Sequence, residues 1–299
     1  MTQRVSDAQR LANHQAYMAA AQGRMDNLQQ QLATGRKIER ASDDPAGASL
    51  ALQHRRNIAF ESQMRRNIDG GLAFMNATEA ALDGATQSLQ RARELAVQAS
   101  SDSMGAPQRD AIAEEMDQII NHLVQVGNTR FGEAYIFGGH QSQQPAFSIV
   151  PGPDGAAAVN FDGDNGERLR RISHSDEAAV NVSGEEAFGQ TFDDLIALRN
   201  TLRNGSPGED IAPSIENIEG AIERVLAARS DIGARTNRFE AAQRQSEVTN
   251  IDLQELRSNV EDVDIARAIV EMQGAQTSLQ AAIGAIGRTN NMTLLNFLR

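Results

Sequence analysis

The sequence contains no cysteine and no tryptophan, and both absences restrict what the protein can be. Without cysteine there are no disulfides, no thiolate nucleophiles, no cysteine-ligated zinc and no iron–sulfur clusters. Aromatic residues make up only 4% of the 299 residues, although large aromatics usually dominate the burial in compact cores. Alanine, leucine, isoleucine, valine and methionine must therefore do most of the packing, which suits long helices with narrow apolar stripes.

Long apolar runs are also missing. None reaches the ~20 residues that a membrane-spanning helix needs, and the first residues, MTQRVSDAQRLANHQ, lack the hydrophobic segment of a cleaved secretion signal. Taken alone, these absences indicate a cytoplasmic protein. The net charge is −12 and no basic tract occurs, which argues against nucleic-acid binding. We therefore expect neither nucleic acid nor a membrane as a partner.

The residues that usually carry chemistry do not occur in functional patterns. Gly35-Arg36-Lys37 lacks the upstream glycine of a phosphate-binding loop, and no GxGxxG, HExxH or GxSxG motif occurs. The five histidines lack metal-ligand spacing. Asp43 and Asp44 could be read as paired catalytic carboxylates, but capping of a following helix explains both. We expect no catalytic residue, no cofactor and no metal, and hence no enzyme.

Both ends of the chain carry helical apolar stripes. Residues 5–34 are predicted to form a helix that Gly35 ends, with apolar positions spaced three and four apart as in a heptad. The N-terminal stripe consists of Leu11, His14, Met18, Ala21, Met25, Leu28 and Leu32. The C-terminal stripe consists of Ile265, Ile269, Met272, Gln276, Leu279, Ile283 and Ile286. An antiparallel pairing of the first and last helices is the economical arrangement.

Between these ends the pattern is helical with one interruption. Ser42, Asp43 and Asp44 followed by Pro45 are typical of a helix start. Helices are predicted over about 45–99, 106–129, 191–203 and 208–257. Glycine and proline gather after Tyr135, and short strands are expected at 168–172 and 180–182.

The predicted fold class is mainly α, with a long helical coiled-coil and rod built from both chain ends and a small β-rich domain inserted in the middle. Residues 1–35 and 259–299 are expected to form a terminal coiled-coil domain. Residues 36–135 and 191–258 are expected to form a helical rod, and 136–190 the inserted β-rich domain.

The terminal stripes are too thin to order their helices alone, because fixing each residue costs backbone entropy and one helix covers only one side of another. Such ends are expected to become ordered when neighbouring copies cover them, as in a polymerising subunit. The alternative is an intramolecular coiled coil with frayed ends. The acidic run Glu261, Asp262 and Asp264 is interpreted as a charged face opening the last helix, and reversal of the Asp262 charge is predicted to prevent polymerisation.

Four segments resemble segments of the flagellin superfamily and occur along the chain in the same order as in that family: LQQQLATGRKIERASDDPAG, LQRARELAVQAS, EAYIFGG and NVEDVDIARAIVEMQGAQTSLQAAIGAIGR. The first contains Gly35, Asp43, Asp44 and Pro45, and the last contains Asp262 and Asp264. Pro45, FDGDNGERLRRIS and the ending LLNFLR are similar to the hook–filament junction family, also called hook-associated protein 3. LQRARELAVQAS is flagellin-like, so a divergent flagellin stays as an alternative.

The resemblance implies a structural subunit of the bacterial flagellum that joins the hook to the filament and is needed for swimming. It also implies extracellular delivery, unfolded, through the flagellar type III channel without a cleaved signal. The implied partners are further copies of the chain, the other hook–filament junction protein, flagellin, and an export chaperone at the C-terminal helix.

Overall fold

In the computed structural model, the described residues are 2–101, 104–153 and 155–297, and the side chains of 2–8, 10, 11, 14 and 285–297 lie outside that description. The chain divides into two compact units. Unit 1 comprises Met1–Phe60 and Asn250–Arg299, and unit 2 comprises Glu61–Thr249. Two long helices, α2 (Pro45–Ala99) and α6 (Ala212–Glu261), contribute residues to both units.

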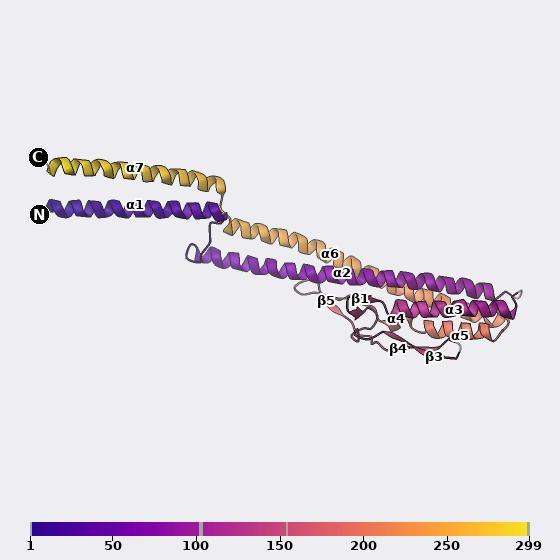
Figure 1. Cartoon of the computed structure of the whole chain (residues 1–299). Coiled ribbons are helices and arrows are strands. Elements are labelled where there is room, and N and C mark those ends of the chain that lie inside the picture. Colours follow the sequence, from indigo (N-terminus) through magenta and orange to yellow (C-terminus); the bar gives the residue numbers. More distant parts are fainter. Residues whose placement is uncertain (1, 102–103, 154, 298–299) are drawn as a thin grey trace. The chain divides into compact units, whose positions relative to one another are not determined.

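Unit 1 is built on the first and last helices, α1 (Thr2–Thr34) and α7 (Ile265–Phe297). They lie side by side and run antiparallel, so the predicted pairing is confirmed (Figure 1). Gly35 ends α1 with a φ of 73°, a backbone conformation that glycine adopts without strain. Its amide donates to the Gln31 carbonyl over 2.8 Å, which closes the last turn of the helix.

Unit 2 is a helical body in which segments of α2 and α6 pair antiparallel. Side-chain contacts between the two helices establish that direction: Arg93 pairs with Glu219, Arg229 pairs with Glu79, and Gln243 donates to Asp69. Helices α3 (Ala106–Gly127) and α5 (Thr191–Arg203) pack on each other beside this pair. The predicted helices over 45–99 and 191–203 are confirmed, and the others differ from the prediction by a few residues at their ends.

Among the described residues, the middle of the chain forms three antiparallel hairpins rather than one continuous sheet. They are β1 (Arg130–Phe131) with β2 (Ala134–Tyr135), β3 (Phe147–Gly152) with β4 (Gly155–Phe161), and β5 (Leu169–Arg171) with β6 (Glu177–Ala179). A short helix, α4 (Gly184–Phe188), follows them, and a 3-10 turn (Gly208–Asp210) precedes α6.

The strand expected at 180–182 lies earlier, at 177–179. After β6 the Val180 amide still donates to the Arg168 carbonyl over 3.0 Å, and the next contacts are made by the Asn181 side chain. Asn181 accepts a hydrogen bond from the Arg168 amide over 2.6 Å and donates to the Gly166 carbonyl over 2.9 Å. Val180 and Val182 are buried, but they follow the strand instead of forming it, so the predicted strand boundary was wrong.

The apolar core of the described chain belongs to unit 2. Its largest fully buried side chains include Ile68, Met75, Leu82, Phe137 and Phe239. The few aromatic residues are concentrated there: the Phe147 ring lies 5.0 Å from Phe192, 5.3 Å from Phe161 and 5.5 Å from Phe188, measured between ring centroids. Unit 2 therefore has its own hydrophobic centre, which joins the β-hairpins to the helices.

Candidate assembly surface

The α1–α7 seam is the line of side chains through which the two terminal helices contact each other. Beside the partly buried Gln31, the partly or fully buried apolar positions on α1 follow the predicted heptad: Met18, Ala21, Met25, Leu28 and Leu32. On α7 they are Ala268, Met272, Ala275, Leu279 and Ala282. Three of these α7 positions are alanines, and small side chains allow helices to approach closely.

The C-terminal stripe predicted from the sequence only partly coincides with this seam. Met272 and Leu279 lie in it, whereas Ile265, Ile269 and Ile283 are exposed by 58%, 40% and 53%. The polar Gln276 is exposed as well. Alanines occupy three of the five described seam positions on α7, whereas the predicted stripe counted hydrophobicity alone. The assignment of the isoleucines to an assembly interface stays a prediction. Leu11, His14 and Ile286 lie outside the described side chains.

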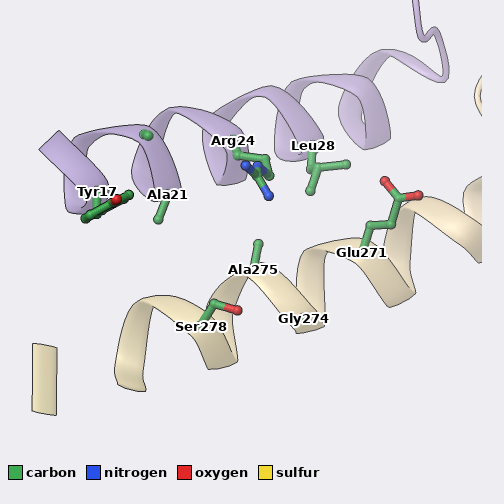
Figure 2. A pocket seen from close by; sticks show the side chains of 9 residues that line it. Tyr17, Ala21, Arg24, Leu28, Glu271, Gly274, Ala275 and Ser278 are labelled. Carbon is green, nitrogen blue, oxygen red and sulfur yellow. The ribbon is translucent and has the colours of Figure 1, made fainter. Parts of the chain in front are cut away.

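A groove opens between the two helices on one flank of the seam. It has a volume of about 410 Å³. Tyr17, Ala21, Arg24 and Leu28 of α1 line it opposite Glu271, Gly274, Ala275 and Ser278 of α7 (Figure 2). Ala20 completes the α1 side. Its α7 wall is made of small residues except at Glu271, so the groove is open rather than filled from within.

A buried carboxylate fixes the point where α1 ends and α7 begins. Glu261 is 1% exposed and is the last residue of α6, so it does not open the last helix as the sequence interpretation held. Its Oε1 lies 3.0 Å from Arg36 Nε, and Arg55 Nε donates to Oε2 over 3.2 Å. Arg55 Nη2 also donates to Oε1. Two guanidinium groups compensate the cost of burying this charge.

Backbone pairing reinforces the same joint. The Lys37 amide donates to the Glu261 carbonyl over 2.8 Å, and the Val263 amide donates to the Gly35 carbonyl over 2.9 Å. Arg36 and Asp262 therefore form an antiparallel bridge. Residues more than two hundred positions apart meet here, and no local pattern in the sequence could have indicated Glu261 as their common partner.

The two aspartates of the DDP motif have separate tasks. Asp44 caps α2: its Oδ1 accepts from the amides of Ala46 and Gly47 over 3.1 and 3.0 Å, ahead of Pro45 at the first helical position. Asp43 instead binds the preceding part of the loop: its Oδ2 accepts from the amides of Glu39 and Arg40 over 3.2 and 2.9 Å. The prediction that both residues cap the helix is therefore correct for Asp44 alone.

Hydrogen bonds from the Arg40 and Glu39 amides hold the pKa of the Asp43 carboxyl below its usual value. Gly47 lies close against this turn: a Cβ there would lie 2.6 Å from Ile38 Cδ1, so a larger residue would require that side chain to shift. The motif thus shapes the loop between α1 and α2, and its carboxylates are occupied by backbone amides rather than free for acid–base chemistry.

Of the acidic residues near the last helix, Asp264 caps α7. Its Oδ1 accepts from the Arg267 amide over 3.1 Å. Asp262 is exposed. Arg267 pairs with Glu271 one turn later, over 2.9 Å, and this contact raises the pKa of the arginine.

Within the described ranges there is no group of three or more histidine, aspartate or glutamate side chains arranged to hold a metal. The helices that the structure describes include none long and apolar enough to cross a membrane. Unit 1 presents a seam between α1 and α7, exposed isoleucines on α7 and an open groove.

The fold thus combines a helical unit that has its own apolar core with a pair of terminal helices that expose large apolar side chains. The family comparisons agree. The bacterial flagellin N-terminal helical region matches residues 5–142, and the bacterial flagellin C-terminal helical region matches residues 215–298. Together these regions cover most of the chain, which therefore belongs to the bacterial flagellin family and is a structural, non-enzymatic flagellar protein.

Individual relatives extend over nearly the whole chain. It is 27% identical over 261 residues to the flagellar filament 30.7 kDa core protein of Treponema maltophilum, covering 87% of each chain. It is 24% identical over 278 residues to a flagellin of Halalkalibacterium halodurans, covering 90% of each.

Among solved structures, a Vibrio parahaemolyticus protein assigned provisionally as a flagellar hook-associated protein matches with a TM-score of 0.67 and 18% identity, over 74% of this chain and 100% of that one. The flagellar junction protein FlgL of Legionella pneumophila matches with a TM-score of 0.57 and 17% identity, over 73% and 100%. At these identities the likeness concerns the fold.

Proposed function

We propose that this chain is the adaptor that joins the flagellar hook to the flagellin filament. The observation that carries the proposal is the difference in apolar burial between the two units. Unit 2 holds the apolar core, whereas unit 1 leaves Ile265, Ile269 and Ile283 exposed on a helix pair with a thin seam. A body that folds alone and a tail that needs neighbours are the properties of an assembling subunit.

The charge distribution supports assembly through unit 1. Unit 1 contains twelve basic and eleven acidic residues, whereas unit 2 contains sixteen basic and twenty-nine acidic ones. A nearly neutral surface associates more readily than one with a large charge of one sign. Copies can therefore pack through their terminal helices while their acidic bodies stay apart and hydrated.

The likeness to junction proteins supports the adaptor over the filament protein. The Legionella junction protein and the Vibrio protein align over their full lengths, so this chain includes a complete counterpart of that compact fold. The proposed neighbours are further copies of the chain, the other junction protein on the hook side and flagellin on the filament side. The proposed location is the extracellular hook–filament junction.

A divergent flagellin is the second candidate, and the sequence relatives favour it, because they are filament proteins that align over about nine-tenths of the chain. The number of copies separates the two. A filament protein would dominate sheared filaments, whereas an adaptor would be a trace component at their hook-proximal end.

Deletion of the gene tests the proposal. The expected result is a cell that keeps its hooks, releases flagellin monomers into the medium and does not swim, because flagellin lacks a surface to add to. Electron microscopy with an antibody against unit 2 is expected to label the distal end of the hook only. Filaments of normal length in the deletion strain, or labelling along the filament, would contradict the adaptor role.

Export is also part of the proposal. We infer that the chain leaves the cell unfolded through the flagellar type III channel, and that a chaperone covers the apolar flank of α7 beforehand. Co-purification of such a chaperone with the full chain, and its loss when residues 265–299 are deleted, is the expected result. Export that is unaffected by this deletion would contradict the assignment.

A further inference from the structure

Among the described side chains of α7, three isoleucines are exposed on one side of the terminal helix pair and are called the isoleucine ridge: Ile265, Ile269 and Ile283. A helix turns by about 100° per residue, so Ile265 and Ile283 point in the same direction and Ile269 lies about 40° from them. Within α7 these side chains have no seam partner, and each leaves two-fifths or more of its surface in water.

Figure 2 shows the interhelical groove, and helix rotation places its lining residue Gly274 on α7 away from the ridge. Gly274, which lines it, is about 180° around α7 from Ile265 by the same rotation. The seam residues Ala268 and Met272 lie between the two directions. One flank of the helix pair is therefore convex and aliphatic, and the opposite flank is concave and lined by small residues.

The two flanks are complementary in shape and chemistry. Ala20, Ala21, Gly274 and Ala275 leave room in the groove for branched side chains that would add dispersion contacts. A Cβ built on Gly274 meets nothing within 4 Å, so this room belongs to the outside and not to the chain's own packing.

Charge does not oppose the contact. The groove carries Arg24 and Glu271, one of each sign. Gln276 and Gln280 are exposed on α7 near the direction of the ridge, and their uncharged amides can donate to the carboxylate and accept from the guanidinium. Because unit 1 is close to neutral as a whole, a second copy of the same unit meets no strong repulsion.

We propose that the isoleucine ridge of one copy docks into the interhelical groove of a second copy. The two contacting surfaces are then different parts of the same domain, and such a head-to-tail contact repeats from copy to copy. Repetition of this kind closes into a ring or continues as a helix, in contrast to a twofold contact that stops at a dimer. The inference rests on the proposed function, because it names the lateral partner of the same terminal domain.

Filling the groove is the first test. Gly274→Leu places a branched side chain where the neighbour's isoleucine would lie, and leucine is a better helix former than glycine, so the chain itself should fold at least as well. We expect the amount of this variant in purified hook–filament fractions to fall about tenfold or more relative to the unchanged chain. Gly23→Leu is the matched control, because Gly23 also has nothing within 4 Å of a Cβ and does not line the groove.

The melting temperature and helix content of both purified variants are measured alongside, so that a folding defect is recognised. Loss of Gly274→Leu from the fractions with retention of Gly23→Leu supports the docking. Normal incorporation of Gly274→Leu, or equal loss of both variants, overturns it.

Disulfide cross-linking is the second test. Because the chain has no cysteine of its own, only the introduced cysteines can form a disulfide between copies. Ile269→Cys and Ser278→Cys are produced together in one cell as separate chains, and flagella are treated with a mild oxidant. We expect cross-linked dimers when both variants are present and none when either is present alone. Dimers of Ile269→Cys alone would show a twofold contact and overturn the head-to-tail arrangement.

The two levels of the hypothesis fail in different ways. If the unchanged chain is absent from hook–filament fractions, the proposed function fails. If it is present there, while the cysteine pair gives no dimer and Gly274→Leu is incorporated normally, only the ridge-and-groove contact fails.

Discussion

Arg199 illustrates how a single buried charge holds the elements of unit 2 together. It is 3% exposed, its Nη1 lies 2.6 Å from Asp117 Oδ1, and its Nη2 donates to the Ala156 carbonyl over 2.8 Å. Arg203 binds the second oxygen of Asp117 over 2.6 Å. Helix α5 is thereby attached to α3 and to strand β4 through one carboxylate.

Arg199→Met is expected to lower the free energy of unfolding by about 3 kcal/mol, because the half-satisfied Asp117 and the β4 carbonyl lose their donors in a buried place. Urea unfolding followed by far-UV circular dichroism measures this. Arg171→Met is the control: its pair with Glu177 is about half exposed, and such pairs contribute roughly 0–1 kcal/mol. Equal losses in the two variants would contradict the assignment.

The Asp43 carboxylate makes the loop between α1 and α2 sensitive to acid. Its pKa is depressed in the folded chain because the Arg40 and Glu39 amides donate to it. A depressed pKa contributes stability above the unfolded value of about 3.9, and this contribution is lost as the pH falls through the folded pKa. We expect the exchange protection of the Arg40 amide to decrease below about pH 4 in the unchanged chain.

The Asp43→Asn variant separates this effect from general acid unfolding. Its amide can still accept hydrogen bonds but does not titrate, so the protection of Arg40 should no longer follow the pH in that range. The measurement is hydrogen exchange read by NMR or mass spectrometry. An identical acid response in the two proteins would show that Asp43 is not the group responsible.

At the scale of elements, the joint between α6 and α7 depends on Glu261. This residue ends α6, accepts from two arginines and is followed by the backbone bridge to the end of α1. Because the same joint fixes where α7 starts, it sets the register of the α1–α7 seam. The helices were predictable from their heptads, but the register between them depends on this cluster.

Glu261→Gln removes the charge while keeping the shape, and we expect it to destabilise the joint by about 2 kcal/mol, the scale of hydrogen bonds to charged groups. The amides of Lys37 and Val263, which bond across the joint, should exchange faster. Glu255→Gln changes an exposed glutamate of α6 and should leave both amides unchanged. No change at Lys37 and Val263 in Glu261→Gln would contradict this role.

At the scale of the whole molecule, stability is expected to be uneven. The apolar core is in unit 2, whereas the buried apolar side chains described in unit 1 are Leu28, Ile38, Ala51 and Ala268. In dilute solution, amides of α1 and α7 should therefore exchange much faster than those of the unit 2 core, and they should become protected in assembled flagella. Hydrogen exchange of the free and the assembled chain measures this, and full protection of both terminal helices in the monomer would contradict it.

The sequence by itself determined the long helices, their antiparallel return and the family, because helix signals are local and repeat every three or four residues. Gly35 and Pro45 mark ends that any chain of this pattern would show. It also located the β-hairpin segment through its glycines and prolines, and it indicated which stripe of α1 is buried.

Tertiary structure decided the rest. Which face of α7 meets α1 depends on close approach through Ala268, Ala275 and Ala282, and a count of hydrophobic residues favours the isoleucines instead. Asp43 and Asp44 accept hydrogen bonds from different backbone amides only because of the way the loop folds. Glu261 pairs with Arg36 and Arg55, which are distant from it in the sequence. Local patterns fix elements, whereas contacts between elements depend on packing distances and on charges that meet only in the folded chain.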